Sequence, residues 1–275
     1  MLKQLLATLE QDRSAFRSFA ARCSLSERMD ALVLAEDDPS LQRTAASIQD
    51  QLAQADERFF ERVRARLRTH MFTRPGLIRS FWRYAAREDA SAGYAPLDVL
   101  LAGILDAGEL PDELPRSSEM VAYQPAPGRI ILALLEQLRP SDVFYDIGSG
   151  LGRVVIAAAL LTAARAKGIE FQPTFCEYSA RAAAAVNAQA EFVAMDARAA
   201  PFADGDVFFL YTPFRGALLH SVLSRLHEVA QHKPIRVCSF GPCTLELAQS
   251  AWLTLQAGSL DPEELAVFTT QKLRR

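Results

Sequence analysis

A run of glycines that begins at an acidic residue is the feature of this sequence with the clearest chemical meaning. It reads Asp146-Ile147-Gly148-Ser149-Gly150-Leu151-Gly152 and lies between the apolar run Val143-Phe144-Tyr145 and a helical run that starts at Arg153. Glycine adopts backbone angles that other residues avoid and lets a ligand lie against bare main chain. A strand, a glycine-rich turn and a helix in this order are typical of sites that hold nucleotide-type cofactors.

The glycine spacing and the leading acid indicate the charge of the ligand. Dinucleotide sites use G-x-G-x-x-G and place a pyrophosphate at the helix N-terminus, whereas this loop is G-x-G-x-G and follows Asp146. Because a carboxylate repels a pyrophosphate and attracts a cation, we expect the amino group of S-adenosylmethionine (SAM) near Asp146, directly or through water. We predict that Gly148, Ser149, Gly150 and Gly152 complete this cofactor loop.

Two later acids follow predicted strands. Glu177, in Phe175-Cys176-Glu177-Tyr178-Ser179, is expected at the end of the second strand, where a carboxylate accepts hydrogen bonds from ribose hydroxyls. The alternative is an acid at a helix N-terminus. Asp196 is expected at the end of the third strand, where it would accept the adenine amino group while the Ala197 amide reaches a ring nitrogen. The alternative is a solvated loop acid.

The fourth predicted strand ends in Tyr211-Thr212-Pro213-Phe214, where a transferred group would lie. An aromatic wall there would position an acceptor and favour a cationic sulfonium. Tyr211, Pro213 and Phe214 are therefore the candidate catalytic residues. A strand that enters a proline turn, with its aromatic residues in the core, is an equally weighted interpretation.

A basic segment lies far from this loop, at residues 58–87. Aromatic residues alternate with its arginines, and Glu61 is its one acid between Arg58 and Arg87; the residues are Arg58, Arg62, Arg64, Arg66, Arg68, Arg74, Arg79, Arg83 and Arg87, with Phe72, Phe81, Trp82 and Tyr84. Such a pattern is able to follow a phosphate backbone and stack on bases, so RNA is one possible partner. The favoured alternative is the solvated face of amphipathic helices.

The elements that must position these residues divide the chain in two. Residues 1–118 show helical spacing of apolar residues and predict an N-terminal all-helical domain that ends in a linker at 108–118. Residues 119–275 form the second predicted domain, with strands at 143–147, 171–176, 191–195, 206–211 and 235–240. Helices are predicted between them at 153–167, 178–189 and 215–230. This alternation predicts an α/β, doubly wound, mostly parallel sheet, closed by an antiparallel hairpin of residues 252–257 and 265–270.

Composition narrows the setting. The chain has 275 residues, 50% hydrophobic residues and a net charge of −3, which gives no overall attraction to nucleic acid or anionic membranes. No apolar run is long enough to span a bilayer, and the N-terminus does not resemble a secretory signal. Four widely spaced cysteines predict reduced, mostly buried thiols rather than a metal site. We therefore expect a cytoplasmic protein without a metal or a membrane partner.

The cofactor loop and the acids after it resemble the class I (Rossmann-like, seven-stranded) methyltransferases over residues 120–275. Within that superfamily, the segment from Tyr145 to Val155 is similar to the disruptor-of-telomeric-silencing (DOT-like) histone lysine methyltransferases, as is a lead-in that contains Tyr123 and Pro125. The resemblance implies SAM held by Asp146, Gly148, Gly150, Glu177 and Asp196, with Tyr123 lining the cofactor.

The sequence also departs from that family. DOT-like enzymes carry an Asn-bearing segment after the fourth strand, and amino methyltransferases often carry Asn or Asp before Pro-Pro and an aromatic residue, whereas this chain has Tyr211-Thr212-Pro213-Phe214, without the Asn or Asp. The methyl acceptor, whether protein, RNA or small molecule, is therefore not identified. Two alternatives remain: a non-catalytic SAM-binding or partner-binding protein, and an NAD-dependent oxidoreductase, which the glycine spacing disfavours.

Overall fold

The chain divides into two compact units, Met1–Asp106 and Ala107–Arg275, and each is described by itself. The structure is a computed structural model, and it describes residues 1–69, 74–85, 95–113 and 115–270. The sequence predicts the second domain from residue 119. The second unit begins earlier because residues ahead of that point bond to it: the Ala107 amide donates to the Tyr178 hydroxyl at 3.1 Å, and the Thr174 hydroxyl donates to the Asp112 carbonyl at 3.1 Å.

The first unit is helical throughout its described elements, which are α1 (Leu2–Gln11), the 3-10 turn η1 (Ser14–Phe16), α2 (Phe19–Leu34), α3 (Pro39–Arg68), α4 (Arg74–Ala85) and α5 (Pro96–Ile104). Leu2, Leu5 and Leu9 repeat at helical spacing and bury one face of α1 in a core with Met29 and Leu52. The all-helical texture predicted for this region is thus confirmed for the residues that the structure describes.

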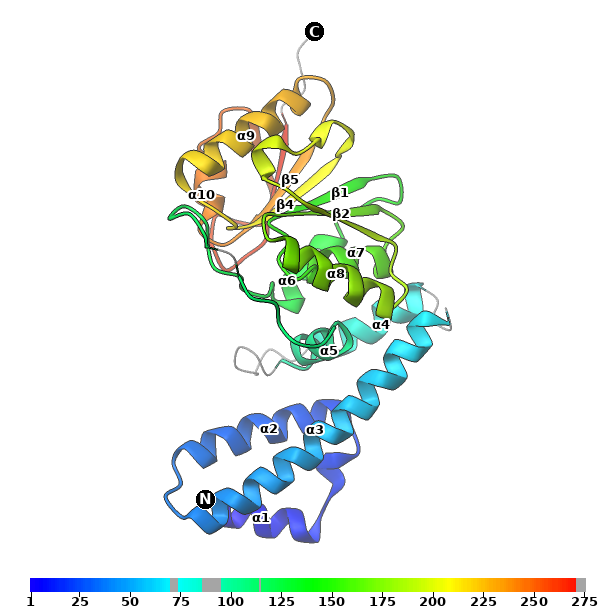
Figure 1. The fold of residues 1–275 in the computed structure, drawn as a ribbon, viewed down its shortest axis with the longest axis vertical. Coiled ribbons are helices and arrows are strands. Elements are labelled where there is room, and N and C mark those ends of the chain that lie inside the picture. Colours follow the sequence, from blue (N-terminus) through cyan, green and yellow to red (C-terminus); the bar gives the residue numbers. More distant parts are fainter. Residues whose placement is uncertain (70–73, 86–94, 114, 271–275) are drawn as a thin grey trace. The chain divides into compact units, whose positions relative to one another are not determined.

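A 30-residue helix, α3, runs the length of the first unit (Figure 1). Asp38 caps its N-terminus by accepting from the Ser40 amide at 2.8 Å, and Pro39 occupies the first turn, where a missing N–H is harmless. No helix among the described residues is long and apolar enough to cross a membrane.

The second unit is built on one seven-stranded sheet in the order β3-β2-β1-β4-β5-β7-β6 (Figure 1). The strands are β1 (Val143–Ile147), β2 (Arg165–Glu170), β3 (Ala190–Ala194), β4 (Val207–Tyr211), β5 (Arg236–Phe240), β6 (Leu253–Ala257) and β7 (Ala266–Thr270). The first five are parallel, and β7 joins β5 and β6 in antiparallel pairs. The predicted doubly wound sheet with a closing hairpin is confirmed.

Helices cover both faces of this sheet. They are α6 (Gly128–Leu135), α7 (Arg153–Leu161), α8 (Pro173–Ala185), α9 (Gly216–Ala230) and α10 (Cys243–Ala248), with the 3-10 turns η2 (Ala197–Ala199) and η3 (Phe202–Asp204). Neighbouring helices α6, α7 and α8 cover one face, whereas α9 packs with η2 and η3 on the other (Figure 1). Strand β1 has β2 on one side and β4 on the other, so the chain reverses its direction of winding there. A ligand crevice is expected at the carboxyl end of such a strand.

The prediction of a second strand at residues 171–176 is wrong. The strand lies earlier, at β2 (Arg165–Glu170), and Pro173 opens α8 instead. The segment Arg165-Ala166-Lys167 has helical propensity, and the predicted helix at 153–167 therefore extended into it. Pairing with β1 on one side and β3 on the other overrides that propensity. Helix α7 ends at Leu161, and the Thr162 hydroxyl donates to the Ala158 carbonyl at 2.7 Å.

Candidate functional site

The glycine loop leaves β1 with a backbone that requires glycine. Gly148, Gly150 and Gly152 have φ angles of 79°, 52° and 76°, in the left-handed region. A Cβ added at Gly148 would lie 2.3 Å from the Pro213 side chain, and one added at Gly150 would lie 2.4 Å from the Tyr123 ring. These two glycines therefore let the β4–α9 loop and the 119–124 segment approach the cofactor loop closely.

The third glycine has a structural role. Gly152 is the N-cap of α7, and a Cβ there would lie 2.7 Å from Ser179 on α8. It does not line the cavity described below. Its place in the motif is explained by the packing of α7 against α8, because a side chain would force these helices apart.

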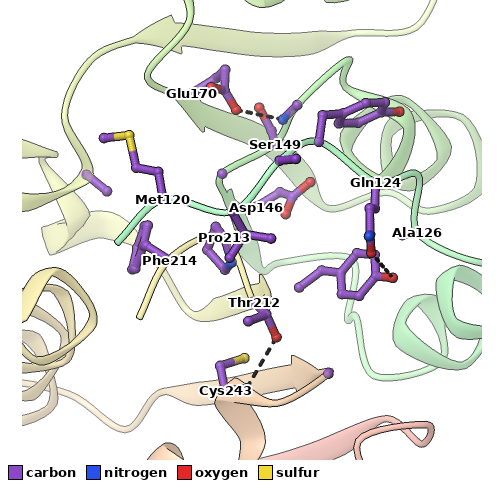
Figure 2. A pocket seen from close by; sticks show the side chains of 18 of the residues that line it. Met120, Gln124, Ala126, Asp146, Ser149, Glu170, Thr212, Pro213, Phe214 and Cys243 are labelled. Atoms are coloured by element: carbon purple, nitrogen blue, oxygen red, sulfur yellow. Dashed lines mark hydrogen bonds between the residues drawn. The ribbon is translucent and has the colours of Figure 1, made fainter. Parts of the chain in front are cut away.

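Main-chain hydrogen bonds tie the loop to β2. The amides of Gly148 and Ser149 donate to the Ile169 carbonyl at 2.8 and 3.0 Å, and the Gly150 amide donates to Glu170 Oε2 at 2.8 Å (Figure 2). The Ser149 hydroxyl is buried and has no hydrogen-bond partner among the described residues. Glu170, which ends β2, therefore holds the loop in place from the neighbouring strand.

Two buried carboxyls face one cavity from β1 and β2. Asp146 is 3% exposed and lies at the centre of the site (Figure 2). Burial, followed by the charge of Glu170, raises the pKa of Asp146 to about 8. Burial also raises the pKa of Glu170, although the amides of Gln172 and Gly150 oppose this by bonding to its carboxylate. A cation placed between these acids would be strongly favoured because it would stabilise their ionised forms.

The predicted position of Glu177 at a strand end is wrong. Glu177 lies on the exposed side of α8, away from the cavity, because the strand before it ends at Glu170. Glu170 takes the position expected for the ribose-binding acid. The sequence signal that would have found it is Pro173, whose preference for the first helical turn places the strand end just ahead of it.

Asp196 follows β3, as predicted, and lines the same cavity with Met195 and Ala197. Its side chain caps η2 by accepting from the Arg198 amide at 2.9 Å, and it forms an ion pair with the Arg198 guanidinium at 2.6 Å. The hydrogen bond from that guanidinium is the largest cause that lowers the pKa of Asp196. The Asp196 carboxylate is thus ionised and able to accept a hydrogen bond from a ligand.

The segment of residues 119–124, which we call the strap, crosses the β4–α9 loop and carries Tyr123 to the cofactor loop. Met120 forms an antiparallel bridge with Phe214, and the Val121 amide donates to the Pro213 carbonyl at 3.0 Å (Figure 2). Glu119, which the sequence did not single out, caps α9 by accepting from the Ala217 and Leu218 amides at 2.8 and 3.1 Å.

Tyr123 lies against Phe175, with ring centroids 5.9 Å apart, and burial raises its pKa to about 12. Its phenol therefore remains neutral at physiological pH. Tyr123 lines the cavity next to the glycine loop, in the position that the resemblance implied.

The end of β4 holds a strained residue. Thr212 has a φ angle of 38°, which is rare for a β-branched residue. Its hydroxyl donates to the Phe240 carbonyl at 3.2 Å and accepts from the Cys243 amide at 3.2 Å (Figure 2). The Tyr211 ring packs on Phe240 with centroids 4.8 Å apart. This strain turns the chain so that Tyr211 and Pro213 both line the cavity.

These features enclose a cavity of about 570 Å³ within the second unit. That volume is within the range of small-molecule and cofactor sites. Ten of the twelve predicted site residues line it: Tyr123, Asp146, Gly148, Ser149, Gly150, Asp196, Ala197, Tyr211, Pro213 and Phe214. Gln124, Glu170, Phe240, Cys243 and Glu246 also line it and were not predicted.

The cysteines do not contribute a metal site. Cys23, Cys176, Cys238 and Cys243 are buried free thiols. The described part of the chain holds no group of three or more His, Cys, Asp or Glu side chains placed to bind a metal ion.

Comparison with known proteins finds a family match that covers part of the second unit, from α6 to β4. Residues 130–212 match the family described as histone methylation protein DOT1. This match runs from α6 to the end of β4 and stops before α9. No curated protein matches the chain.

Several solved structures are similar in part. An RNA methyltransferase from Salinibacter ruber is 25% identical, with 55% of this chain and 97% of that chain covered and a TM-score of 0.43. A Pyrococcus abyssi tRNA (uracil-54, C5)-methyltransferase is 18% identical, with 55% of this chain and 40% of that chain covered and a TM-score of 0.43. Magnesium protoporphyrin IX methyltransferase from Synechocystis PCC 6803 is 14% identical, with 52% of this chain and 80% of that chain covered and a TM-score of 0.40. TM-scores of this size carry no argument about the acceptor.

The fold and the site are those of one enzyme class. A sheet in the order β3-β2-β1-β4-β5-β7-β6, a glycine loop after β1 and acids at or just beyond the carboxyl ends of β1, β2 and β3 are all present in one unit. Together with the family match over residues 130–212, they support a class I, SAM-dependent methyltransferase whose cofactor loop is similar to that of the DOT1 family.

Proposed function

We propose that the second unit binds SAM along the carboxyl ends of β1, β2 and β3 and transfers its methyl group to an acceptor that enters beside Tyr211. One observation carries this proposal: Asp146, Glu170 and Asp196 lie at or just beyond the carboxyl ends of three neighbouring parallel strands, and all three line one cavity with the glycine loop. Their order in the sheet matches the order of the chemical groups along the ligand, which are an ammonium, a ribose and an adenine.

In this arrangement Asp146 holds the ammonium of the methionine part, beside the glycine loop that follows it. Glu170 accepts hydrogen bonds from the ribose hydroxyls through lone pairs that its two amide donors leave available. Asp196 accepts the adenine amino group, and the Ala197 amide reaches a ring nitrogen. The hydrogen-bonding capacity of each residue fits the group assigned to it.

Bound SAM supplies an electrophilic methyl group on a cationic sulfonium. The protein has to align the acceptor with that methyl and exclude water, and alignment alone supplies a large part of the rate enhancement of such transfers. Tyr211, packed on Phe240, and Pro213 form the wall where the acceptor would lie. The Thr212 hydroxyl is already bonded to the Phe240 carbonyl and the Cys243 amide, so this residue shapes the wall.

The nature of the acceptor is not inherited from the family match. The match ends at residue 212, at the start of the acceptor wall, and Tyr211-Thr212-Pro213-Phe214 lacks the Asn or Asp that amino methyltransferases often carry there. We therefore treat protein, RNA and small molecules as acceptor classes to be separated by experiment.

The test is transfer of labelled methyl from SAM into fractionated cell extract by the wild-type protein, followed by separation of protein, RNA and small molecules. Asp146→Ala and Gly150→Val should each abolish SAM binding and labelling while the circular dichroism spectrum is retained. Glu177→Gln, on the exposed side of α8, is the matched control and should label as the wild type does. Unchanged SAM affinity in both site variants would refute the site assignment.

A non-catalytic SAM-binding protein is the second candidate, because the segment Tyr211-Thr212-Pro213-Phe214 lacks the Asn or Asp that amino methyltransferases often carry there. It predicts SAM binding that depends on Asp146 together with no labelling of any fraction. The NAD-dependent alternative predicts instead that NAD, and not SAM, raises the melting temperature.

A further inference from the structure

The helical unit carries a concentration of positive charge that the methyl-transfer site does not use. Residues 58–85 contain eight arginines and one glutamate, a net charge of +7, although the whole chain has a net charge of −3. Of the wider segment predicted from sequence, Phe72 and Arg87 lie outside the described residues. The described part includes the C-terminal half of α3 and all of α4.

On α3, arginines occupy the face opposite the core. Phe60 and Leu67 point inward, whereas Arg58, Arg62 and Arg66 are exposed and repeat every four residues, so they form one stripe along the helix. Arg64 is different: its guanidinium bonds to the Glu57 carboxylate and the Gly103 carbonyl and supports the fold.

Helix α4 exposes arginines and one tryptophan. Leu77 and Phe81 are buried, while Arg79, Trp82 and Arg83 lie on the outer face at spacings of three and one residues. Trp82 is 40% exposed, and α4 contains no acidic residue. Trp82 is therefore partly exposed on a helix whose charged residues are all basic.

The two arginine helices belong to one packed body. Phe19 of α2 stacks on Phe59 of α3 with ring centroids 4.8 Å apart, and it also meets Tyr84 of α4 edge-on at 5.5 Å. The Arg22–Asp56 ion pair, at 2.5 Å and largely buried, joins α2 to α3 nearby. The outer faces of α3 and α4 are thus presented by a common aromatic core.

We infer that Arg58, Arg62, Arg79, Arg83 and Trp82, here called the arginine surface, bind single-stranded nucleic acid. Among the described residues these four exposed guanidiniums form no hydrogen bond or ion pair, and guanidiniums are suited to binding phosphates. A partly exposed aromatic ring near arginines is suited to stacking on a nucleic-acid base. Nucleic acid supplies both phosphates and bases, whereas an acidic protein segment supplies the negative charge alone. A single exposed aromatic residue provides too little apolar area to favour a membrane surface.

This inference concerns the helical unit and is tested on the full chain without SAM, so it can fail independently of the methyl-transfer proposal. The probes are a fluorescein-labelled 16-nucleotide RNA, the DNA of the same sequence and the corresponding duplex, with binding followed by fluorescence anisotropy. If four arginines contact phosphates, the slope of log affinity against log salt should be about −3, which means about 50-fold weaker binding at 200 mM than at 50 mM salt. Tighter binding to RNA than to DNA, or the reverse, identifies which strand is preferred.

The variants separate charge from stacking. Arg79→Ala with Arg83→Ala should reduce the magnitude of the salt slope by about 1.4. Trp82→Ala should weaken binding about 5- to 150-fold with the slope unchanged, and Trp82→Phe should restore most of the affinity. Arg28→Ala with Arg43→Ala removes the same charge from exposed positions of the same unit and should leave affinity unchanged.

A second measurement reports stacking directly. The chain has two tryptophans, so Trp252→Phe leaves Trp82 as the sole indole, and its fluorescence should be quenched on addition of the oligonucleotide. Equal loss of affinity in the control pair would overturn the inference, as would an unchanged affinity in Trp82→Ala. Equally tight binding of polyglutamate would assign the surface to acidic protein segments, and binding only to anionic phosphatidylserine vesicles would assign it to a membrane.

Discussion

Asp146 has the properties of a carboxyl that releases a proton when SAM binds. Burial and the nearby Glu170 raise its pKa from 3.8 to about 8 in the ligand-free site. At pH 7 roughly nine-tenths of the protein then carries a neutral Asp146. In the proposed complex the SAM ammonium favours the ionised carboxylate, so it should lower this pKa and drive the proton into solution.

The magnitude follows from the size of that shift. Below pH 8 each bound SAM must displace a proton, so affinity falls as the pH is lowered, and it levels off as the pH rises above 8. Between pH 8 and pH 6 the dissociation constant should rise about 50-fold, equivalent to about 2.3 kcal/mol. Tyr123 contributes little in this range, because burial raises its pKa to about 12.

Isothermal titration calorimetry at pH 7, in buffers with different ionisation enthalpies, counts the protons released. We expect about 0.9 proton per SAM for the wild type. Asp146→Asn should release none and bind weakly with no pH dependence between pH 6 and 8. Glu170→Gln removes a charge that raises the pKa of Asp146, and should therefore move the midpoint of the pH dependence downward.

The stability of the ligand-free protein should change with pH in the opposite direction to its affinity for SAM. Because the folded-state pKa of Asp146 lies above its unfolded value of 3.8, the free energy of unfolding contributed by this residue is lost as the pH rises from 3.8 toward 8. At pH 7 the penalty is at most about 4 kcal/mol, so Asp146→Asn should raise the melting temperature of the ligand-free protein. Proton release near zero in the wild type, or a melting temperature lowered by Asp146→Asn, would refute this reasoning.

Three further predictions follow from the site. Glu170→Ala should weaken SAM binding about 10- to 100-fold because it removes hydrogen bonds to a charged group. The SAM affinity of Glu177→Ala should stay within about twofold of the wild-type value. Equilibrium dialysis measures both affinities, and a larger loss in Glu177→Ala would contradict the assignment of the β2 acid. Gly150→Ala should lower SAM affinity because its Cβ would lie 2.4 Å from the Tyr123 ring, and adding Tyr123→Ala should recover part of the loss if steric overlap is the cause. Thr212→Val keeps the side-chain shape but removes a hydroxyl that bonds to two main-chain groups. Urea unfolding should therefore show a free energy of unfolding that is lower by about 1–3 kcal/mol. An unchanged unfolding midpoint would show that the hydroxyl does not support the loop.

Much of the cofactor loop was predictable because its signals are local. Glycines with positive φ, an apolar strand before them and a helix after them are set by neighbours in the sequence. The closing hairpin was predictable for the same reason, since a turn-rich stretch separates two short apolar runs. The acids Asp146 and Asp196 were found because the strands before them have ordinary strand composition.

The position of β2 was not predictable from local composition. Ala166, Lys167 and Gly168 form a strand because β1 and β3 pair with them on both sides. Gly168 is required there by a distant residue, since a Cβ at that position would lie 2.6 Å from the Ser149 hydroxyl. This contact between distant chain segments cannot be predicted from residues 165–170 alone. Because the second strand was predicted too late in the sequence, Glu177 was predicted as the ribose-binding acid.

The sequence by itself therefore determined the class of fold, the glycine loop and the position of Asp146 near the end of β1, because these follow from the composition of neighbouring residues. Only the tertiary structure decided that Glu170 is the acid of the second strand and that Tyr123 covers Gly150. It also showed that the Thr212 hydroxyl braces the acceptor wall. Each of these depends on residues that are distant in the chain and adjacent only after the sheet has formed.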